Sequence, residues 1–91
     1  MRRAAKVDVN QREIVNGLRH LGCTVYSLSA VGQGCPDLLC GHAGKTYLLE
    51  VKTRTGRLTP DEITWHENWL GQVAVVRTLE EAADAVGVWI L

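Results

Sequence analysis

Apolar residues near the start of the chain recur at the spacing of a helix. The residues that share this face are Ile14, Val15, Leu18 and Leu21. Side chains three or four positions apart lie together on a helix, so the pattern predicts an amphipathic helix. Asp8 followed by Gln11 resembles a capping box, and we expect the helix to begin near Asp8 or Asn10 and to end at Gly22.

The next part of the chain has the pattern of strands. Alternating or continuously apolar side chains predict strands over residues 23–28, 37–41 and 46–53. A tight turn around Ala43-Gly44 closes the last two strands into a hairpin. Residues 29–34, which contain two glycines, and the polar residues 54–58 are expected as loops.

Two later helices carry start signals. Thr59-Pro60-Asp61-Glu62 places Thr at the N-cap, Pro at the first helical position and Glu at the third, and we expect this helix to end at Gly71. A second helix opens at Thr78 and ends at Gly87 by the same logic. Between them, residues 73–76 predict a short buried strand, and residues 88–91 could form a final edge strand.

The order of these elements is α-β-β-β-α-β-α, which predicts an α/β sandwich with a central mixed sheet flanked by helices. With 91 residues, the chain fits one domain, 1–91, in which residues 1–7 could form a flexible basic arm. No stretch approaches the roughly 20 apolar residues of a membrane helix, and no apolar signal core follows the basic N-terminus. Three cysteines without CxxC spacing argue against a disulfide framework and favour a cytoplasmic location.

The formal net charge of zero argues against a strongly basic nucleic-acid binder, but the charges are segregated. Residues 1–57 carry nine basic and four acidic side chains, whereas residues 58–91 carry one basic and six acidic ones. Such asymmetry is a reason to suspect a polyanionic partner. Two solvated faces of opposite sign would produce it as well, so charge alone does not decide.

The most informative motif is Gly34-Cys35-Pro36-Asp37 followed by Glu50-Val51-Lys52. Glu50 and Lys52 lie two apart on a predicted strand and therefore point to the same face. If the hairpin turn has two residues, Asp37 lies opposite Glu50 on that face. A three-residue turn would shift the register by one and put Asp37 on the other face.

Facing carboxylates repel each other unless a cation lies between them. Mg²⁺ and Mn²⁺ prefer such oxygens, so Asp37 and Glu50 are candidate metal ligands. A metal there can lower the pKa of a bound water and stabilise charge on a phosphoryl oxygen, and Lys52 can orient that water or neutralise developing charge. These are the requirements of phosphodiester hydrolysis. The simpler alternative is a surface ion pair on a half-exposed strand.

The motif resembles the PD-(D/E)XK nuclease superfamily, and in particular its small stand-alone virus-type replication-repair nucleases (VRR-NUC), which are frequently phage-encoded. The supporting features, within residues 8–77, are Asn10-Gln11-x-Glu13-Ile14-Val15, Gly-x-Pro36-Asp37, Glu50-Val51-Lys52, Leu58-Thr59-Pro60 and Trp65-His66. The resemblance implies a restriction-endonuclease-like fold and a metal-dependent endonuclease. It implies that Asp37 and Glu50 bind the metal and that Lys52 supports catalysis.

The resemblance also implies roles at positions that the residues alone leave open. Glu13 would join the metal site, directly or through water, although by itself it is an ordinary solvated glutamate of the first helix. Family members often have a glutamine on the helix after the third strand, and Glu62 occupies the corresponding position here. Because Glu62 could be only the capping partner of Thr59, Glu62 is a weaker candidate, as is Gln11.

A basic surface around such a site suits DNA. The candidate phosphate contacts are Lys6, Arg12, Arg54 and Arg57. No helix-turn-helix or zinc finger is evident, so we expect contacts that position double-stranded or branched DNA without reading its sequence. A domain this small cannot surround a duplex, and relatives commonly work as homodimers, so we expect a homodimer. Trp65 and Trp69 are expected as core or subunit contacts rather than as platforms for bases.

Two functions remain open at this point. The first is a Mg²⁺- or Mn²⁺-dependent DNA endonuclease that acts in replication, repair or recombination. The second is a catalytically silent DNA-binding or assembly module that keeps the fold. A silent module is expected to lose one of the four site residues, and this chain keeps Glu13, Asp37, Glu50 and Lys52.

Overall fold

The first helix is longer than predicted. The computed structural model describes residues 3–88, with side chains from residue 9 onward, and α1 spans Arg3–His20. The predicted start near Asp8 or Asn10 is therefore wrong, because the Ala-Ala-Lys segment upstream consists of strong helix formers that continue the helix. The segment that could have formed a flexible arm has helical backbone from Arg3 onward.

Four strands form one mixed sheet in the order β1-β2-β3-β4. They are β1 (Thr24–Ser27), β2 (Leu38–His42), β3 (Lys45–Val51) and β4 (Val73–Val76). The first three are antiparallel neighbours, and β4 runs parallel to β3. A parallel pair requires a crossover, which here contains α2 (Pro60–Asn68), and α3 (Leu79–Val86) follows β4. The element order and the mixed sheet confirm the predicted fold class.

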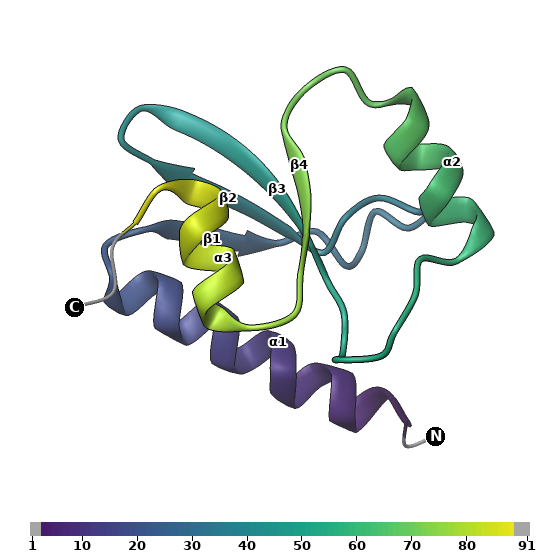
Figure 1. Cartoon of the computed structure of the whole chain (residues 1–91), viewed down its shortest axis with the longest axis horizontal. Coiled ribbons are helices and arrows are strands. Elements are labelled where there is room, and N and C mark those ends of the chain that lie inside the picture. The colour runs from purple at the N-terminus through teal and green to yellow at the C-terminus, as the bar shows by residue number, and fades with distance from the viewer. Residues whose placement is uncertain (1–2, 89–91) are drawn as a thin grey trace.

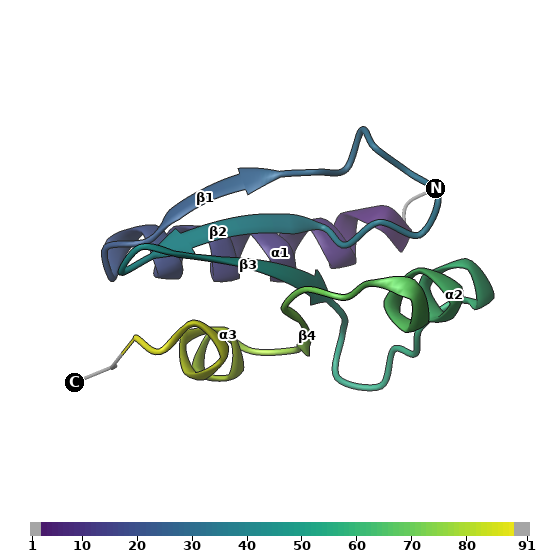
Figure 2. The same ribbon diagram turned by 90° about the horizontal axis from the view of Figure 1, so that it is seen from above.

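The helices are unevenly distributed over the sheet (Figures 1 and 2). α1 packs against β1 and α3, and α3 packs against β4, so these two helices lie side by side on one face. α2 stands apart from them, beyond the end of β3. It ends at Asn68 rather than at the predicted Gly71, because Trp69 has extended backbone and caps the helix. Within residues 3–88, no helix is both long enough and apolar enough to cross a membrane.

The core lies between the sheet and these two helices. Its buried members are Ile14, Leu18, Cys23, Val25, Leu38, Cys40, Leu49, Val51, Val76, Ala82 and Val86. Alternation along the strands sends these side chains inward and leaves Tyr26, Leu39 and Glu50 on the opposite face. Val88 packs against the core, and the other residues of the predicted edge strand, 89–91, lie outside the described part of the chain.

A two-residue turn joins β2 to β3. His42 pairs with Lys45 across it, and both turn residues, Ala43 and Gly44, have positive φ angles. Positive φ at both positions is the geometry of a type I′ turn, which matches the twist of the flanking strands. The predicted tight turn is confirmed, and the register that it sets carries the site described below.

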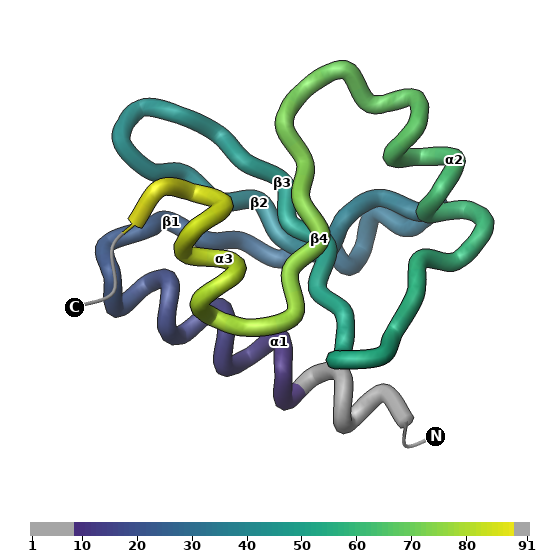
Figure 3. Tube along the Cα trace, viewed as in Figure 1, coloured from purple at the N-terminus to yellow at the C-terminus, as the bar shows by residue number. Residues whose placement is uncertain are grey.

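The loop between β1 and β2 lies against the start of α2 (Figure 3). Gly34 has a φ of +82° and lies so close to the main-chain carbonyl of Asp61 that a Cβ atom would overlap it. Only glycine combines this backbone conformation with this approach. Gly34 therefore fixes the segment leading into Asp37 against the first turn of α2.

Replacing Gly34 by alanine should disturb this junction more than the same change at Gly32. Both have positive φ, but a Cβ at Gly32 would have nothing within 4 Å. Gly32→Ala should therefore cost only the backbone strain, about 1 kcal/mol of the free energy of unfolding. Gly34→Ala adds steric overlap and should cost about 2–4 kcal/mol. Urea denaturation measures both, and equal losses would show that the contact with Asp61 is unimportant.

Candidate active site

Asp37 immediately precedes β2 and is fixed there by main-chain contacts. Its Oδ2 atom accepts a hydrogen bond of 2.7 Å from the N–H of Val51, and its carbonyl accepts one of 2.7 Å from the N–H of Leu28. Leu38 pairs with Leu49 at the end of the β2–β3 ladder, so the same register places Asp37 opposite Glu50. The two carboxyl groups thus share the face of the sheet that points away from α1 and α3.

Glu50 is a buried carboxylate with an unsatisfied oxygen. Its side chain is 2% exposed, and its Oε1 atom has no hydrogen-bond partner among the described residues. Burial, followed by the neighbouring Asp37, raises the pKa of Glu50 to about 8, although Lys52 acts in the opposite direction. A buried charge without a partner is costly. This position therefore fits a bound cation.

Lys52 projects toward the same face from the residue after β3. Its Nζ atom lies 2.7 Å from Oε1 of Glu62 and 3.7 Å from Oε2 of Glu50. Its main chain is held on both sides, because its N–H donates to the carbonyl of Val76 and its carbonyl accepts from the side chain of Asn10, each at 3.0 Å. The ammonium group is therefore positioned between two carboxylates.

Glu62 has two roles at once. It forms the predicted capping box, since its Oε1 accepts from the Thr59 N–H at 2.8 Å and its own N–H donates to Thr59 Oγ1 at 3.2 Å. The same Oε1 binds Lys52. Burial alone would raise the pKa of Glu62, but the bonds from Lys52 and Thr59 outweigh it and lower this pKa. Glu62 therefore joins the start of α2 to the site.

His66 is a residue at the site to which the sequence analysis gave no role. It lies one turn after Glu62 on α2, and residues four apart share a helix face. Its Nε2 atom is buried, has no partner in the described part of the chain, and lies 4.0 Å from Oε1 of Glu50. The Trp65-His66 pair was visible in the sequence, but only the position of α2 beyond the end of β3 brings the imidazole to Glu50.

The donor set fits a hard cation that keeps several waters. Asp37 and Glu50 offer carboxylate oxygens, and Mg²⁺ is commonly held by one or two carboxylates together with water. No three acidic, histidine or cysteine side chains among the described residues converge closely enough to hold a metal by themselves. Glu13 is exposed and lines a groove with Asn10 and Arg54, so its predicted place in the metal site stays a prediction.

Comparisons with known proteins identify the fold. No family model matches the sequence, and no curated protein does. A solved structure described as a VRR_NUC domain is similar to this chain with a TM-score of 0.73 and 25% identity, over 93% of this chain and 98% of that one. The chain has the fold of a VRR-NUC domain. The predicted resemblance is thereby confirmed over nearly the whole length.

In this VRR-NUC fold, a groove that carries basic groups lies along α1 and the segment that follows Lys52. Besides Asn10 and Glu13, it is lined by Val9, Thr53, Arg54, Thr55 and Arg77, and its volume is about 490 Å³. Arg54 is exposed. Arg77 was not singled out in the sequence, yet its Nη2 atom donates to the carbonyl of Gly56 at 2.8 Å and so braces the loop that follows Lys52.

The other residues that the sequence singled out for DNA binding or for the site do not lie together. Gln11 and Arg12 line a separate groove on α1, together with Arg19, and so lie apart from Arg54. Arg57 is exposed in the loop before α2. The side chain of Lys6 lies outside the described residues. The structure therefore places Asp37, Glu50, Lys52 and Glu62 together in one site, whereas Gln11 lies in a different groove.

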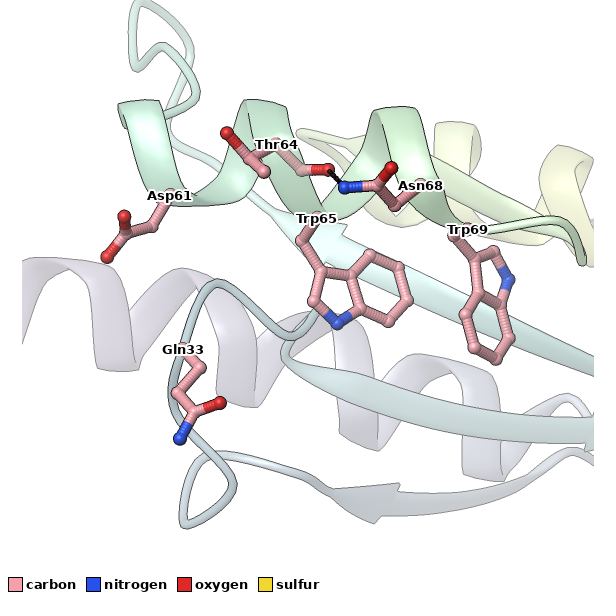
Figure 4. A pocket seen from close by; sticks show the side chains of 6 residues that line it. All are labelled: Gln33, Asp61, Thr64, Trp65, Asn68 and Trp69. Atoms are coloured by element: carbon pink, nitrogen blue, oxygen red, sulfur yellow. Dashed lines mark hydrogen bonds between the residues drawn. The ribbon is translucent and has the colours of Figure 1, made fainter.

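Trp65 of α2 and Trp69, which caps this helix, stack on each other next to the loop between β1 and β2. The rings of Trp65 and Trp69 are 4.8 Å apart and tilted by 19°, and they line a groove of about 460 Å³ with Gln33, Asp61, Thr64 and Asn68 (Figure 4). Neither ring is part of the buried core. The predicted core role is therefore wrong, and the predicted subunit contact stays a prediction.

The raised pKa of Glu50 predicts how the stability of the metal-free protein depends on pH. The unfolded chain releases this proton near the ordinary value of 4.5, and the folded chain releases it near 8. The stabilising contribution of protonated Glu50 is thus fully present below about pH 4.5 and is lost as the pH rises through about 8.

Melting temperatures in EDTA between about pH 5 and 8 measure this effect. Wild type should lose more stability over this range than Glu50→Gln, whose side chain does not ionise. Glu67→Gln, which alters an exposed glutamate of α2, is the matched control and should follow wild type. Parallel profiles for wild type and Glu50→Gln would contradict the prediction.

Proposed function

We propose that this chain is a metal-dependent DNA endonuclease that hydrolyses phosphodiester bonds, with Mg²⁺ or Mn²⁺ as its cofactor. The observation that carries the proposal is the buried Glu50 carboxylate, which has an oxygen without a partner and faces Asp37. The similarity to a VRR_NUC domain supports a nuclease-type function in general. DNA is the substrate that such a domain implies.

Each residue of the site has a separate task in this proposal. Asp37 and Glu50 would hold the ion, with Glu13 joining them through water. When bound, the metal supplies a water of lowered pKa and stabilises charge on a phosphoryl oxygen. Lys52 orients the attacking water or neutralises the charge that develops on the phosphate. Glu62 keeps the Lys52 ammonium group in place.

The alternative, a silent DNA-binding module, is less well supported. A module without chemistry has no need of an ammonium group held at 2.7 Å from one carboxylate and 3.7 Å from another. It also has no need of a carboxylate that raises the cost of folding. The retained set of Asp37, Glu50 and Lys52 therefore favours the enzyme.

Plasmid and four-way-junction cleavage with Mg²⁺ or Mn²⁺ tests the proposal. Asp37→Asn and Lys52→Ala should each lower the cleavage rate by about a hundredfold or more. Asparagine is chosen at position 37 because its carbonyl oxygen can still accept the bond from the N–H of Val51.

Lys45→Ala is the matched control for this assay, because Lys45 is an exposed lysine at the other end of β3. It should cleave like wild type. Equal activity in wild type, Asp37→Asn and Lys52→Ala would refute the assignment of the site, and no cleavage by purified wild type with either metal on either substrate would refute the enzyme.

Arg54 and Arg57 are proposed to bind phosphates next to the site, with Arg12 and Lys6 more distant. Both arginines are exposed in the segment that follows Lys52. Each phosphate contact releases counterions, so DNA affinity should fall with salt. In EDTA, which prevents cleavage, Arg54→Ala should weaken DNA binding and reduce the slope of log K against log salt by about one. Fluorescence anisotropy measures this slope. The control Lys45→Ala should leave the slope unchanged. An unchanged slope with Arg54→Ala would show that Arg54 does not contact DNA.

A homodimer is proposed because two copies would present two sites to the strands of a duplex or to a branched junction. Apolar side chains at and after α2 support it, since Ile63 and Trp69 are more than two-fifths exposed and Leu70 is 99% exposed. Exposed apolar groups of this size often mark a contact surface. Light scattering should give twice the chain mass for wild type and the single mass for Leu70→Asp. A monomeric wild type would contradict the dimer.

A further inference from the structure

His66 and Glu50 leave two buried polar atoms facing each other without any partner among the described residues. These atoms are Nε2 of His66 and Oε1 of Glu50. Buried polar atoms in folded proteins are almost always satisfied, so two orphans at one place indicate a missing occupant. The rest of the neighbourhood is paired, because Lys52 binds Glu62 and Asp37 binds the N–H of Val51.

The distance between the two atoms restricts the occupant. At 4.0 Å they are too far apart for a direct hydrogen bond. Two ligand atoms that each lie about 2.1 Å from one ion are at most about 4.2 Å apart, so the gap accepts a single small cation that touches both. A water molecule also fits this distance, and only experiment separates it from an ion.

The spacing of residues on β3 and on α2 explains why His66 and Glu50 face each other. On β3, Glu50 and Lys52 share a face because they are two apart. On α2, Glu62 and His66 share a face because they are four apart. Glu62 binds Lys52, and His66 consequently faces Glu50. The ring of Trp65 packs against that of His66 at 5.8 Å in an edge arrangement and restricts its orientation.

We propose that Nε2 of His66 is a direct ligand of an ion bound at Glu50, and that this nitrogen makes the site prefer Mn²⁺ to Mg²⁺. The inference rests on the proposed function, because it needs a metal at Glu50. Imidazole nitrogen suits transition metals, whereas Mg²⁺ strongly favours oxygen. His66 would therefore set which metal the site selects.

Metal binding to the full chain, measured without DNA, tests this role. Calorimetric titration should show that His66→Gln weakens Mn²⁺ binding about tenfold or more, with less than about a threefold change for Mg²⁺. His20→Gln, at an exposed histidine of α1, is the control and should bind both metals like wild type. Circular dichroism checks that each variant is folded.

Pulsed electron paramagnetic resonance of bound Mn²⁺ gives a second reading that needs no variant. Wild type should show the modulation of a directly bonded ¹⁴N nucleus, and histidine-selective ¹⁵N labelling should change it. Mn²⁺ bound without this coupling, or with equal affinity in His66→Gln, would overturn the role of His66. If Asp37→Asn still abolished that binding, the proposed metal site would stand. Absence of Mn²⁺ binding to wild type would overturn both.

Discussion

The burial of Glu50 beside Asp37 is the constraint on which the rest of the site depends. Its neighbours on β3, Leu49 and Val51, are buried in the core against α1 and α3. A slip of one residue would expose both and bury Glu50 in their place, so the carboxylate cannot turn away. It stays where burial raises its pKa and where one oxygen lacks a partner. The proposed cation would offset this cost, because it gives the buried carboxylate a partner.

α2 completes the site although it lies apart from the helical layer. Its capping residue Glu62 is also the closest partner of Lys52. Because Glu62 is a carboxylate, its bond to the Lys52 ammonium group is charge-assisted and stronger than a bond from a neutral acceptor. The close approach of Gly34 to the first turn of α2 ties the loop before Asp37 to the same helix. Positions distant in sequence are thus coupled through one helix N-terminus.

Much of this arrangement could be predicted from the sequence, because it follows from local rules. The two-residue turn at Ala43-Gly44 determines the register, and the register puts Asp37 opposite Glu50. The capping box of Glu62 is equally local. The place of His66 next to Glu50 could not be predicted in this way, since it depends on where α2 lies relative to β3. The helical pattern alone predicted the exposed position of Glu13, whereas its place in the metal site rested on the family resemblance and depends on how α1 crosses the sheet.

The most direct measurement is anomalous diffraction from a crystal grown or soaked with Mn²⁺. The proposed metal site predicts one strong anomalous peak in contact with the carboxylates of Asp37 and Glu50. Asp37→Asn crystals treated in the same way should lose that peak. A wild-type crystal with Mn²⁺ bound elsewhere and no peak between these two side chains would contradict the metal site and, with it, the proposed chemistry.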